Sequence, residues 1–343
     1  MKTHNFDTPP EKPEEEALPE GLNEAKEEED FLHLLPESLR GKAGWGDPTP
    51  LWQIKPEFVG SRSFPNPVTS LEPKFNKKDW VYASEGPRWL KKALPMDEGG
   101  LAQVFEVYDT KLDKILVAKR LRVPINPHTG SDIDYPSVEP DEVLELEALT
   151  MERLSHFSRI VPEVYDYTKT LDGKVYIIME KIEGKSFYEE LVRGGLDGVA
   201  KVEVLKKVCE GVKVLAEHKV FHGDIKPQNI ILDQNRGGEP RLVDFGNASS
   251  LGKFAQYTTI ETAAPEIFYG GSVKRHTEKS EIYSLGRLAA YVRASIEQSK
   301  REEDLKLVEG LRSITEVACM EEPGERYESV GAMIKDVEKV EHA

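Results

Sequence analysis

Hydrophobic and polar positions along this chain become regular only after about residue 100. Residues 104–109 (VFEVYD) and 115–123 (ILVAKRLRV) are rich in β-branched and aromatic residues and flank a polar turn, which predicts two neighbouring strands. Residues 143–154 place apolar side chains at helical spacing, and residues 174–182 (KVYIIMEKI) again have the character of a strand. The first part of this region is therefore predicted to be a sheet with one helix.

The region that follows is predicted to be mainly helical. Its longest amphipathic segment covers residues 202–218, where apolar residues recur at helical spacing and line one face: Leu205, Val208, Val212 and Leu215. A strand-rich part followed by helices favours an α+β fold with two lobes. No internal repeat is visible, which argues against a solenoid or a propeller.

The N-terminal 95 residues form an extension with a different composition. Residues 1–30 contain eleven acidic side chains and three lysines, so half of the net charge of −16 lies in this tail. The tail has few large apolar residues. It is predicted to be disordered, because it cannot bury enough surface to offset the entropy lost on ordering.

Residues 31–95 are rich in proline and glycine and contain all the tryptophans of the chain: Trp45, Trp52, Trp80 and Trp89. Because side chains of that size seldom stay in water, we expect this segment to pack irregularly on the body of the protein. The alternative is that the acidic tail or the tryptophan-containing segment binds a partner protein.

Composition excludes several classes of protein. The net charge of −16 argues against a nucleic-acid binder, which needs a basic surface to displace counterions from phosphates. No stretch approaches the ~18 consecutive apolar residues of a membrane span, so no membrane association is expected. The two cysteines, Cys209 and Cys319, exclude a disulfide framework and suit a reducing compartment. The first residues lack the apolar core of a secretion signal, so we expect the cytoplasm or the nucleus.

The strongest chemical signal is the sequence HGDIKPQNIILD, followed closely by LVDFG. Phosphoryl transfer requires a carboxylate that aligns the attacking hydroxyl, a cation at the γ-phosphate and oxygen ligands for Mg²⁺. The residues that supply these groups are Asp224, Lys226, Asn229 and Asp244.

The spacing DxKxxN, a strand-like ILD and then DFG resembles the catalytic and metal-binding loops of the eukaryotic-type protein kinase family. The resemblance implies that Asp224 is the catalytic base and that Lys226 contacts the γ-phosphate of ATP. It also implies that Asn229 and Asp244 bind Mg²⁺. The chain is therefore expected to be a serine/threonine protein kinase that uses ATP and Mg²⁺.

This resemblance covers almost all of residues 95–340 and implies a bilobal protein kinase-like fold with ATP in the cleft. Residues 96–183 would form the N-lobe, a small antiparallel sheet with one helix, and residues 184–340 the larger, mainly helical C-lobe. The sequence AAPEIF supplies Glu266, which the family pairs with an arginine in the last helices, and Arg326 stands at the expected place. That pair is expected to be structural.

A second constellation, DEGGLAQVF, is expected to hold the phosphates of the nucleotide. Gly99 and Gly100 form a turn whose backbone N–H groups can approach phosphates, and Val104 follows. The match to the family pattern GxGxxGxV is incomplete, because Asp97 occupies the first glycine position and Ala102 the third. Asp97 would bring a negative charge near the phosphates.

Lys119, at the end of VAK, corresponds to the strand lysine that reaches the α- and β-phosphates in this family. Glu147, on the predicted helix, stands where the lysine-pairing glutamate of the family falls, with Glu145 as a neighbouring alternative. An ion pair between Lys119 and Glu147 would hold the lysine on the nucleotide.

The segment YIIMEKIEGKSF resembles the connection between the two lobes. It would place Met179 behind the adenine and the backbone of Glu180 and Ile182 at the edge of the ring. Apolar residues from both lobes would sandwich the adenine: Val104, Ala118 and Ile231.

Three further residues are expected to support the catalytic loop. His222 and Phe245 would be packed inside the protein. The sequence TEKSEIYSLG resembles the helix whose acid anchors the catalytic loop from beneath, but Glu281 stands where aspartate is usual.

Gly223 occupies the position where many protein kinases carry an arginine that binds a phosphate on the activation segment. We therefore predict an activity that does not depend on phosphorylation of residues 247–263. Serine/threonine specificity is predicted from Lys226 within DIKPQN and from Thr259, which lies five residues before Ala264.

Two other functions are alternatives to a protein kinase. Small-molecule phosphotransferases of the aminoglycoside or choline type also use HGD, a following asparagine and a later metal-binding aspartate. A pseudokinase scaffold would keep the same residues without turnover and would recruit a partner through the N-terminal extension. The motifs VAK and APE, together with Arg326, favour the protein kinase.

Overall fold

The computed structural model describes residues 36–39, 49–51, 88–92, 94–98, 102–121, 140–169, 174–250, 259–268, 276–298, 301 and 304–342. The acidic tail, Gly99 and Gly100, and three of the tryptophans, Trp45, Trp52 and Trp80, lie outside these residues.

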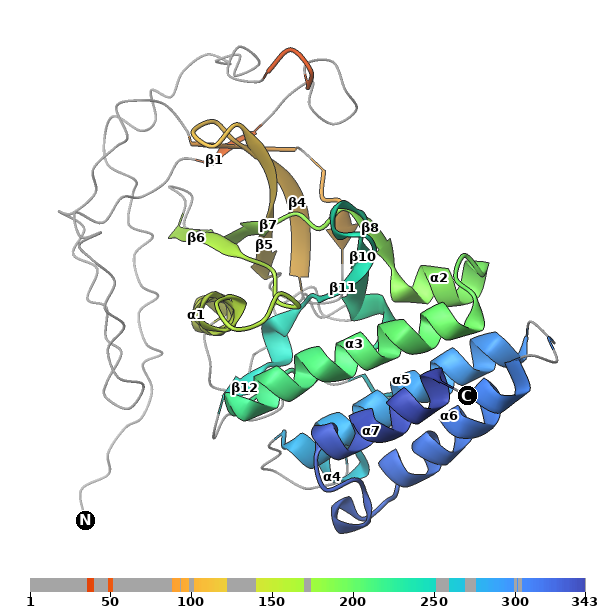
Figure 1. The fold of residues 1–343 in the computed structure, drawn as a ribbon. Helices are drawn as coiled ribbons and strands as arrows, with labels where there is room; N and C mark the ends of the chain where they lie inside the picture. Colours follow the sequence, from red (N-terminus) through yellow and green to blue (C-terminus); the bar gives the residue numbers. More distant parts are fainter. Residues whose placement is uncertain are drawn as a thin grey trace, which may run out of the picture.

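A curled antiparallel sheet forms the upper lobe (Figure 1). Its strands pair in the order β1-β2-β4-β5-β7-β6, and β3 pairs with β4. The seven strands are β1 (Thr49–Leu51), β2 (Trp89–Lys91), β3 (Asp97–Glu98), β4 (Ala102–Asp109), β5 (Lys114–Leu121), β6 (Val164–Lys169) and β7 (Val175–Glu180).

Successive side chains along the central strands point to opposite faces of this sheet. Phe105, Ala118 and Ile178 are aligned across β4, β5 and β7 and belong to one buried cluster together with Trp89. Lys119 is adjacent to Ala118 in β5 and therefore points to the opposite face.

Helix α1 (Pro140–Ser155) packs on the face of the sheet that carries Lys119 and contacts β5, β6 and β7. Leu144 and Ala148 of α1 form a buried cluster with Val175 and Ile177 of β7. Ile177 is aligned with Lys119 in the neighbouring strand. Helix α1 therefore lies on the same side of the sheet as the predicted nucleotide-binding lysine.

The sheet begins earlier in the chain than the boundary at residue 96 predicted from the sequence. Strands β1 and β2 come from residues assigned to the extension, and Trp89 of β2 is fully buried. The expectation that the extension packs on the body is thus confirmed for this tryptophan, although the packing is regular strand pairing.

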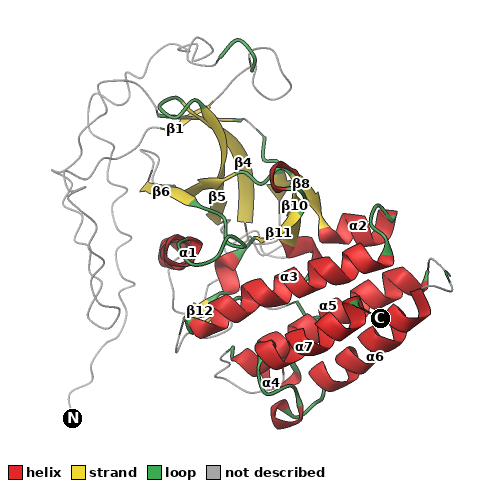
Figure 2. Cartoon of the chain, viewed as in Figure 1, coloured by secondary structure: helices red, strands yellow, loops and turns green. Residues whose placement is uncertain are grey.

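The lower lobe is mainly helical (Figures 1 and 2). Helix α3 lies at its centre and contacts α5, α6 and α7. Its helices are α2 (Phe187–Arg193), α3 (Gly198–Glu217), α4 (Pro265–Phe268), α5 (Glu278–Glu297), α6 (Leu305–Ala318) and α7 (Val330–Glu341). The apolar face predicted for residues 202–218 is buried in this core, as are the facing residues of α5 and α7.

Short strands and 3₁₀ turns join the two lobes and shape the loops between them. Strand β10 pairs with both β8 and β11, and β9 pairs with β12. These elements are β8 (Gly184–Ser186), β9 (Val220–Phe221), η3 (Pro227–Asn229), β10 (Ile230–Asp233), η4 (Gln234–Arg236), β11 (Glu239–Leu242), η5 (Phe245–Asn247), β12 (Ser249–Ser250) and η7 (Pro323–Glu325). The two-lobed α+β fold predicted from the sequence is confirmed.

Local sequence explains where several of these helices begin and end. Ser186 starts α2 with a capping box, since its side chain accepts from the Glu189 N–H and the Glu189 side chain accepts from the Ser186 N–H. Thr277 caps α5 in the same way with Ser280. Gly194 ends α2 in the left-handed conformation, which costs a glycine little. None of the helices in the described part of the chain is long and apolar enough to cross a membrane.

Asp109, at the end of β4, fixes strand β2 to the sheet. Its buried carboxylate accepts hydrogen bonds from Arg88 Nε at 3.0 Å and from Trp89 Nε1 at 3.2 Å. The other oxygen accepts from the backbone N–H groups of Lys111 and Leu112 in the following turn. One carboxylate thus satisfies four donors and joins the extension to the central hairpin.

Replacing Asp109 by alanine should lower the free energy of unfolding by about 2–4 kcal/mol, because the buried indole N–H and the guanidinium lose their acceptor. Urea unfolding followed by circular dichroism measures this loss. Glu309→Ala on α6 is the matched control, because its carboxylate is 73% exposed and pairs with the exposed Arg312, and it should cost less than about 1 kcal/mol. Equal losses in the two variants would contradict the anchoring role of Asp109.

Candidate active site

The loop between β9 and η3 presents Asp224 at the junction of the two lobes. Asp224 Oδ2 accepts hydrogen bonds from Lys226 Nζ at 2.6 Å and from Asn229 Nδ2 at 3.0 Å. Its Oδ1 accepts from the Thr259 hydroxyl at 2.7 Å, and Lys226 Nζ also donates to this hydroxyl at 2.8 Å. The three polar residues of the DxKxxN motif are therefore in mutual contact, and Thr259 joins them.

His222 fixes the loop from within the protein. Its Nδ1 accepts a hydrogen bond from the Asp224 N–H, so the proton is on Nε2, which donates to the Val243 carbonyl at 3.2 Å. The ring packs edge-on against Phe245 with centroids 4.7 Å apart. Burial lowers the pKa of His222, which keeps the imidazole neutral. The predicted packing of His222 and Phe245 is confirmed.

Glu281 of α5 holds the same loop from beneath, as predicted. Its two carboxylate oxygens accept from the backbone N–H groups of His222 and Gly223, both at 2.9 Å. The side chain is 1% exposed, and burial raises its pKa to about 7. The longer glutamate thus reaches both amides. Gly223 itself adopts a left-handed backbone with φ of 79°, a conformation that favours glycine.

Lys119 connects the two lobes through two carboxylates. Its Nζ donates to Glu147 Oε1 on α1 and to Asp244 Oδ1 after β11, each at 2.6 Å. The Lys119–Glu147 pair predicted from the sequence is confirmed. The attraction of Lys119 outweighs the smaller effect of burial and lowers the pKa of Asp244 to about 2, whereas burial raises the pKa of Glu147. The two acids, although close, differ in how readily they ionise.

The donor set fits a divalent cation of the Mg²⁺ type. Both hydrogen bonds of Asn229 use its Nδ2, which leaves Oδ1 for a metal ion, and the ionised Asp244 side chain is 51% exposed. Asp244 also has a left-handed backbone, with φ of 66°, which is unusual for a residue other than glycine and is typical of functional sites. Mg²⁺ is commonly held by only one or two carboxylates together with substrate phosphates.

The structure corrects the prediction that Ala118 contacts the adenine. Ala118 is fully buried in the cluster on the far face of the sheet, with Trp89 and Phe105. Val117 lies two residues before Lys119 and therefore shares its face, aligned with Met179 of β7. The sequence interpretation chose the residue next to the lysine, whereas the two-residue period of a strand selects Val117.

The other residues predicted to surround the adenine retain suitable positions. Val104 is aligned with Lys119 in the sheet, and Met179 is aligned with Val117. Ile231 stands in β10, at the top of the lower lobe. Met96, which the sequence reasoning did not consider, donates its N–H to the Val104 carbonyl at 2.8 Å, and the following residue, Asp97, is aligned with Val104.

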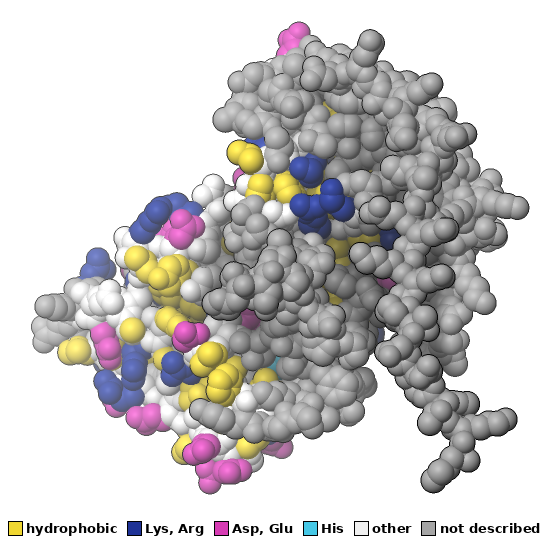
Figure 3. Space-filling view, turned by 180° about the vertical axis from the view of Figure 1, so that it is seen from behind, with side chains coloured by type: hydrophobic (Ala, Val, Ile, Leu, Met, Phe, Trp, Pro, Cys, Tyr) yellow, Lys and Arg dark blue, Asp and Glu magenta, His cyan; other side chains and the backbone are white. Residues whose placement is uncertain are grey.

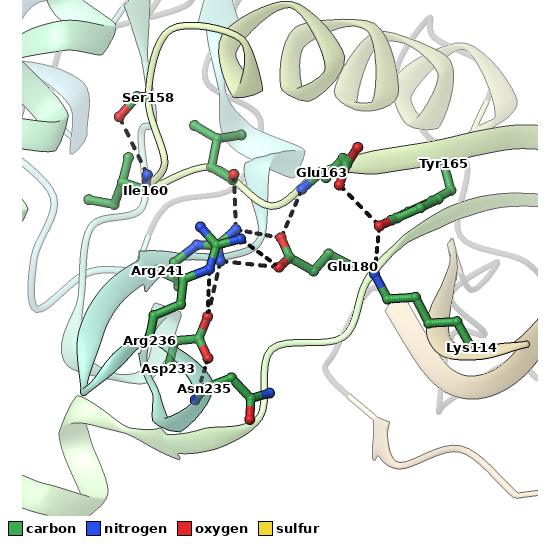
Figure 4. Close-up of polar contacts among 11 residues, drawn as sticks. Lys114, Ser158, Ile160, Glu163, Tyr165, Glu180, Asp233, Asn235, Arg236 and Arg241 are labelled. Carbon is green, nitrogen blue, oxygen red and sulfur yellow. Dashed lines mark hydrogen bonds and ion pairs between the residues drawn. The ribbon is translucent and has the colours of Figure 1, made fainter. Parts of the chain in front are cut away.

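The segment that connects the lobes is fixed by a network of ion pairs (Figure 4). Arg241, 2% exposed, donates to Glu180 Oε2 at 2.6 Å and to Asp233 Oδ2 at 3.1 Å. Burial would raise the pKa of Glu180, but Arg241 outweighs it and lowers the pKa. The Glu180 N–H donates to the Glu163 carbonyl at 2.8 Å. The side chain of Glu180 thus points away from Lys119 and holds the connection in place.

The predicted structural pair in the lower lobe is confirmed. Arg326 binds Glu266 with two parallel hydrogen bonds of 2.7 Å and also donates to the carbonyls of Met320, Glu321 and Lys279. A bidentate pair of this kind is directional and fixes the segment after Thr259 against the last helices.

Basic and acidic side chains are interspersed over the lower lobe on the face shown in Figure 3. The described part of that surface therefore shows mixed charge, in agreement with the composition of the chain.

Comparison with known proteins shows which protein family most of this chain resembles. A family profile described as the protein kinase domain matches residues 92–337. Serine/threonine-protein kinase PknA of Nostoc sp. is 29% identical over 207 residues, which are 57% of this chain and 35% of that protein. Serine/threonine-protein kinase D of Synechocystis sp. is 27% identical over 263 residues, 69% of this chain and 49% of that protein.

A similar relative is Aurora kinase B of Danio rerio, 28% identical over 198 residues, which are 57% of each protein. The chain matches about a third to a half of the length of the two bacterial relatives.

The pKa of Glu281, raised from 4.5 to about 7 by burial, predicts a pH-dependent stability. Between these values the folded protein keeps a proton that the unfolded chain has lost. The free energy of unfolding should therefore fall as the pH rises from about 4.5 to about 7, by on the order of 3 kcal/mol, and this contribution should be flat at higher pH.

Urea unfolding of the wild type and of Glu281→Gln at about pH 5 and about pH 8 measures this effect. Glutamine does not titrate, so the advantage of the wild type over the variant should shrink with rising pH. Parallel pH profiles of the two proteins would show that Glu281 is ionised throughout this range.

Proposed function

We infer that this chain, which belongs to the protein kinase domain family, transfers the γ-phosphoryl group of ATP to a serine or threonine hydroxyl of a protein. The observation that carries this inference is the contact of Asp224 with Lys226, Asn229 and Thr259 beside the Lys119–Asp244 pair. These contacts bring a base, two cations and a metal-binding pair to one place between the lobes.

The residues of the lower lobe have distinct roles in this proposal. Asp224 orients the substrate hydroxyl and accepts its proton through the carboxylate that now accepts from Thr259. Lys226 lies 2.6 Å from Asp224 and neutralises charge on the γ-phosphate. Asn229 and Asp244 would hold Mg²⁺, which would neutralise the negative charge that develops on the phosphate oxygens during transfer.

The upper lobe supplies the nucleotide contacts. Lys119 reaches the α- and β-phosphates, and its ion pair with Glu147 keeps the ammonium aligned. The adenine lies between apolar residues of the two lobes, with the backbone of Glu180 and Ile182 at its edge. The apolar walls are Val104, Val117, Met179 and Ile231. Gly99 and Gly100 are the remaining predicted phosphate contacts and lie outside the described residues.

Specificity for serine and threonine is supported by the position of Thr259. Its hydroxyl lies between Lys226 and Asp224, so the segment before the Glu266–Arg326 pair is held directly beside the base. Two of the relatives compared above, those of Nostoc and Synechocystis, are named serine/threonine-protein kinases.

We also propose that the activity does not require phosphorylation of the activation segment. Gly223 has no side chain, so the arginine that many protein kinases direct at a segment phosphate is missing. The space where a side chain would begin is filled, because a Cβ at Gly223 would lie 2.7 Å from His276 Nε2. The catalytic loop is instead held by the two hydrogen bonds to Glu281.

The primary test is transfer of labelled γ-phosphate to casein and myelin basic protein with Mg²⁺. Asp224→Asn and Lys119→Met should each lower the rate by at least about 100-fold, because the base and the phosphate-binding cation are lost. Asp336→Asn and Lys339→Met are matched controls on the surface of α7 and should keep nearly the full rate.

Three outcomes are informative. Label on phosphoserine or phosphothreonine that is lost in both site variants supports the protein kinase. Transfer only to a small alcohol or amino sugar would favour the small-molecule phosphotransferase. If the folded wild type transfers no phosphate with any divalent metal, the pseudokinase scaffold is favoured. A separate measurement of ATP binding then shows whether the protein still holds the nucleotide.

Phosphatase treatment should leave the transfer rate within about twofold of the rate of the untreated protein, because there is no arginine at position 223 to bind a phosphate. Tyr257→Phe and Thr258→Ala should behave in the same way. The measurement is the initial rate, with the phosphate content of the protein determined by mass spectrometry. Loss of activity that is restored in step with phosphate at Tyr257 or Thr258 would overturn this part of the proposal.

A further inference from the structure

His276 is a buried polar side chain beside the catalytic loop that the proposed mechanism does not use. It lies two residues before helix α5 and is 7% exposed. Its Nε2 is buried without a hydrogen-bond partner among the described residues. A buried polar atom left without a partner destabilises the folded state, so such an atom calls for a reason other than stability.

The imidazole of His276 lies directly over the α-carbon of Gly223. A Cβ at position 223 would stand 2.7 Å from His276 Nε2 and 2.9 Å from His276 Cδ2, both shorter than real side chains allow. The same point lies 2.8 Å from the carbonyl oxygen of Asn247. His276 therefore occupies the place of the side chain that Gly223 lacks, at a position where two loops meet.

These two loops carry the chemistry of the site. Gly223 immediately precedes Asp224, and Asn247 ends η5, three residues after Asp244. The left-handed backbone of Gly223 sets the direction in which the chain enters Asp224. A group that rests on Gly223 beside the Asn247 carbonyl thus influences both the predicted base and the predicted metal ligand.

The charge state of His276 suits contact with this loop. Burial is the main cause that lowers its pKa to about 4, and the neighbouring His222 acts in the same direction. The ring is therefore neutral at ordinary pH. A neutral ring can rest on the α-carbon of Gly223 without an electrostatic effect on Asp224 comparable to that of an arginine at position 223.

We propose that His276 is a positioning residue, which holds the left-handed turn at Gly223 and thereby orients Asp224 in place of a side chain at position 223. Helix α5 and the residues just before it then contact the catalytic loop on two sides. Glu281 accepts a hydrogen bond from the N–H of Gly223, and His276 covers the α-carbon of Gly223. This inference rests on the proposed kinase activity and extends it with a residue outside the motif.

A double-mutant cycle tests the contact. Gly223→Ala should lower kcat by about tenfold or more, because the new methyl group meets the imidazole, and should change the KM for ATP by less than about threefold. His276→Ala alone should lower kcat by about fivefold. In the His276→Ala background, the further effect of Gly223→Ala on kcat should shrink to about threefold, the part that comes from the left-handed backbone and from the Asn247 carbonyl oxygen, 2.8 Å from the new methyl group.

Two further variants separate positioning from stability. His276→Gln keeps a neutral polar group of similar reach and should restore most of kcat. His218→Ala, at the end of α3, removes a partly buried histidine whose ring contacts Phe157 and the Val214 carbonyl rather than Gly223, and should leave kcat nearly unchanged. Independent, multiplicative effects of the Gly223 and His276 substitutions on kcat, or a normal kcat in His276→Ala, would overturn the proposal.

Hydrogen exchange keeps the test independent of turnover. In His276→Ala, the amides of His222, Gly223 and Asp224 should exchange at least about tenfold faster, while those of α3 should be unchanged. This result is expected even if the wild type transfers no phosphate, which would refute the kinase activity alone. Unchanged exchange at these amides in a folded variant would refute the positioning role.

Discussion

The arrangement of the two lobes depends on the ion pairs that the ammonium group of Lys119 forms. It is buried, and it contacts one carboxylate on α1 and another that follows β11, each at 2.6 Å. When both carboxylates are ionised, the two acids and the lysine carry a net negative charge. This charge is balanced when a metal ion binds or when one of the acids moves away. Burial raises the pKa of Glu147 and Lys119 lowers the pKa of Asp244, so the more exposed Asp244 is the more readily ionised of the two acids. The same pair that joins the lobes therefore prepares Asp244 for a cation.

A second constraint acts from the lower lobe. The loop before Asp224 forms two hydrogen bonds with a buried carboxylate of α5, and that helix is itself fixed in the core. The glutamate at position 281, where the family resemblance led us to expect aspartate, reaches one backbone amide with each oxygen. The glycine at position 223 is the other half of this arrangement. It accepts the left-handed backbone at little cost, and its missing side chain makes room for His276.

The sequence predicted the residues whose roles depend on fixed spacing. Asp224, Lys226, Asn229 and Asp244 come together as expected, as do Lys119 with Glu147 and Glu266 with Arg326. The prediction was wrong at Ala118. It took the residue next to Lys119 as an adenine contact, although neighbouring side chains of a strand point to opposite faces of the sheet. The strand at Trp89 was also missed, since three residues are too few for alternation to be recognised and their pairing depends on Asp109, distant in sequence. His276 belongs to no motif, and only the fold brings it to Gly223.

The connection between the lobes shows how these constraints combine. Glu180 is expected to meet the adenine through its backbone, while its carboxylate binds Arg241, three residues before Asp244. Arg241 also binds Asp233 at the end of β10, the strand that carries Ile231. A movement of the connection would therefore disturb β10 and the segment that leads to Asp244 together. Lys119 links Asp244 back to Glu147 of α1, so two sets of charge contacts, joined through the backbone of residues 241–244, hold the region between the lobes where the predicted nucleotide site lies.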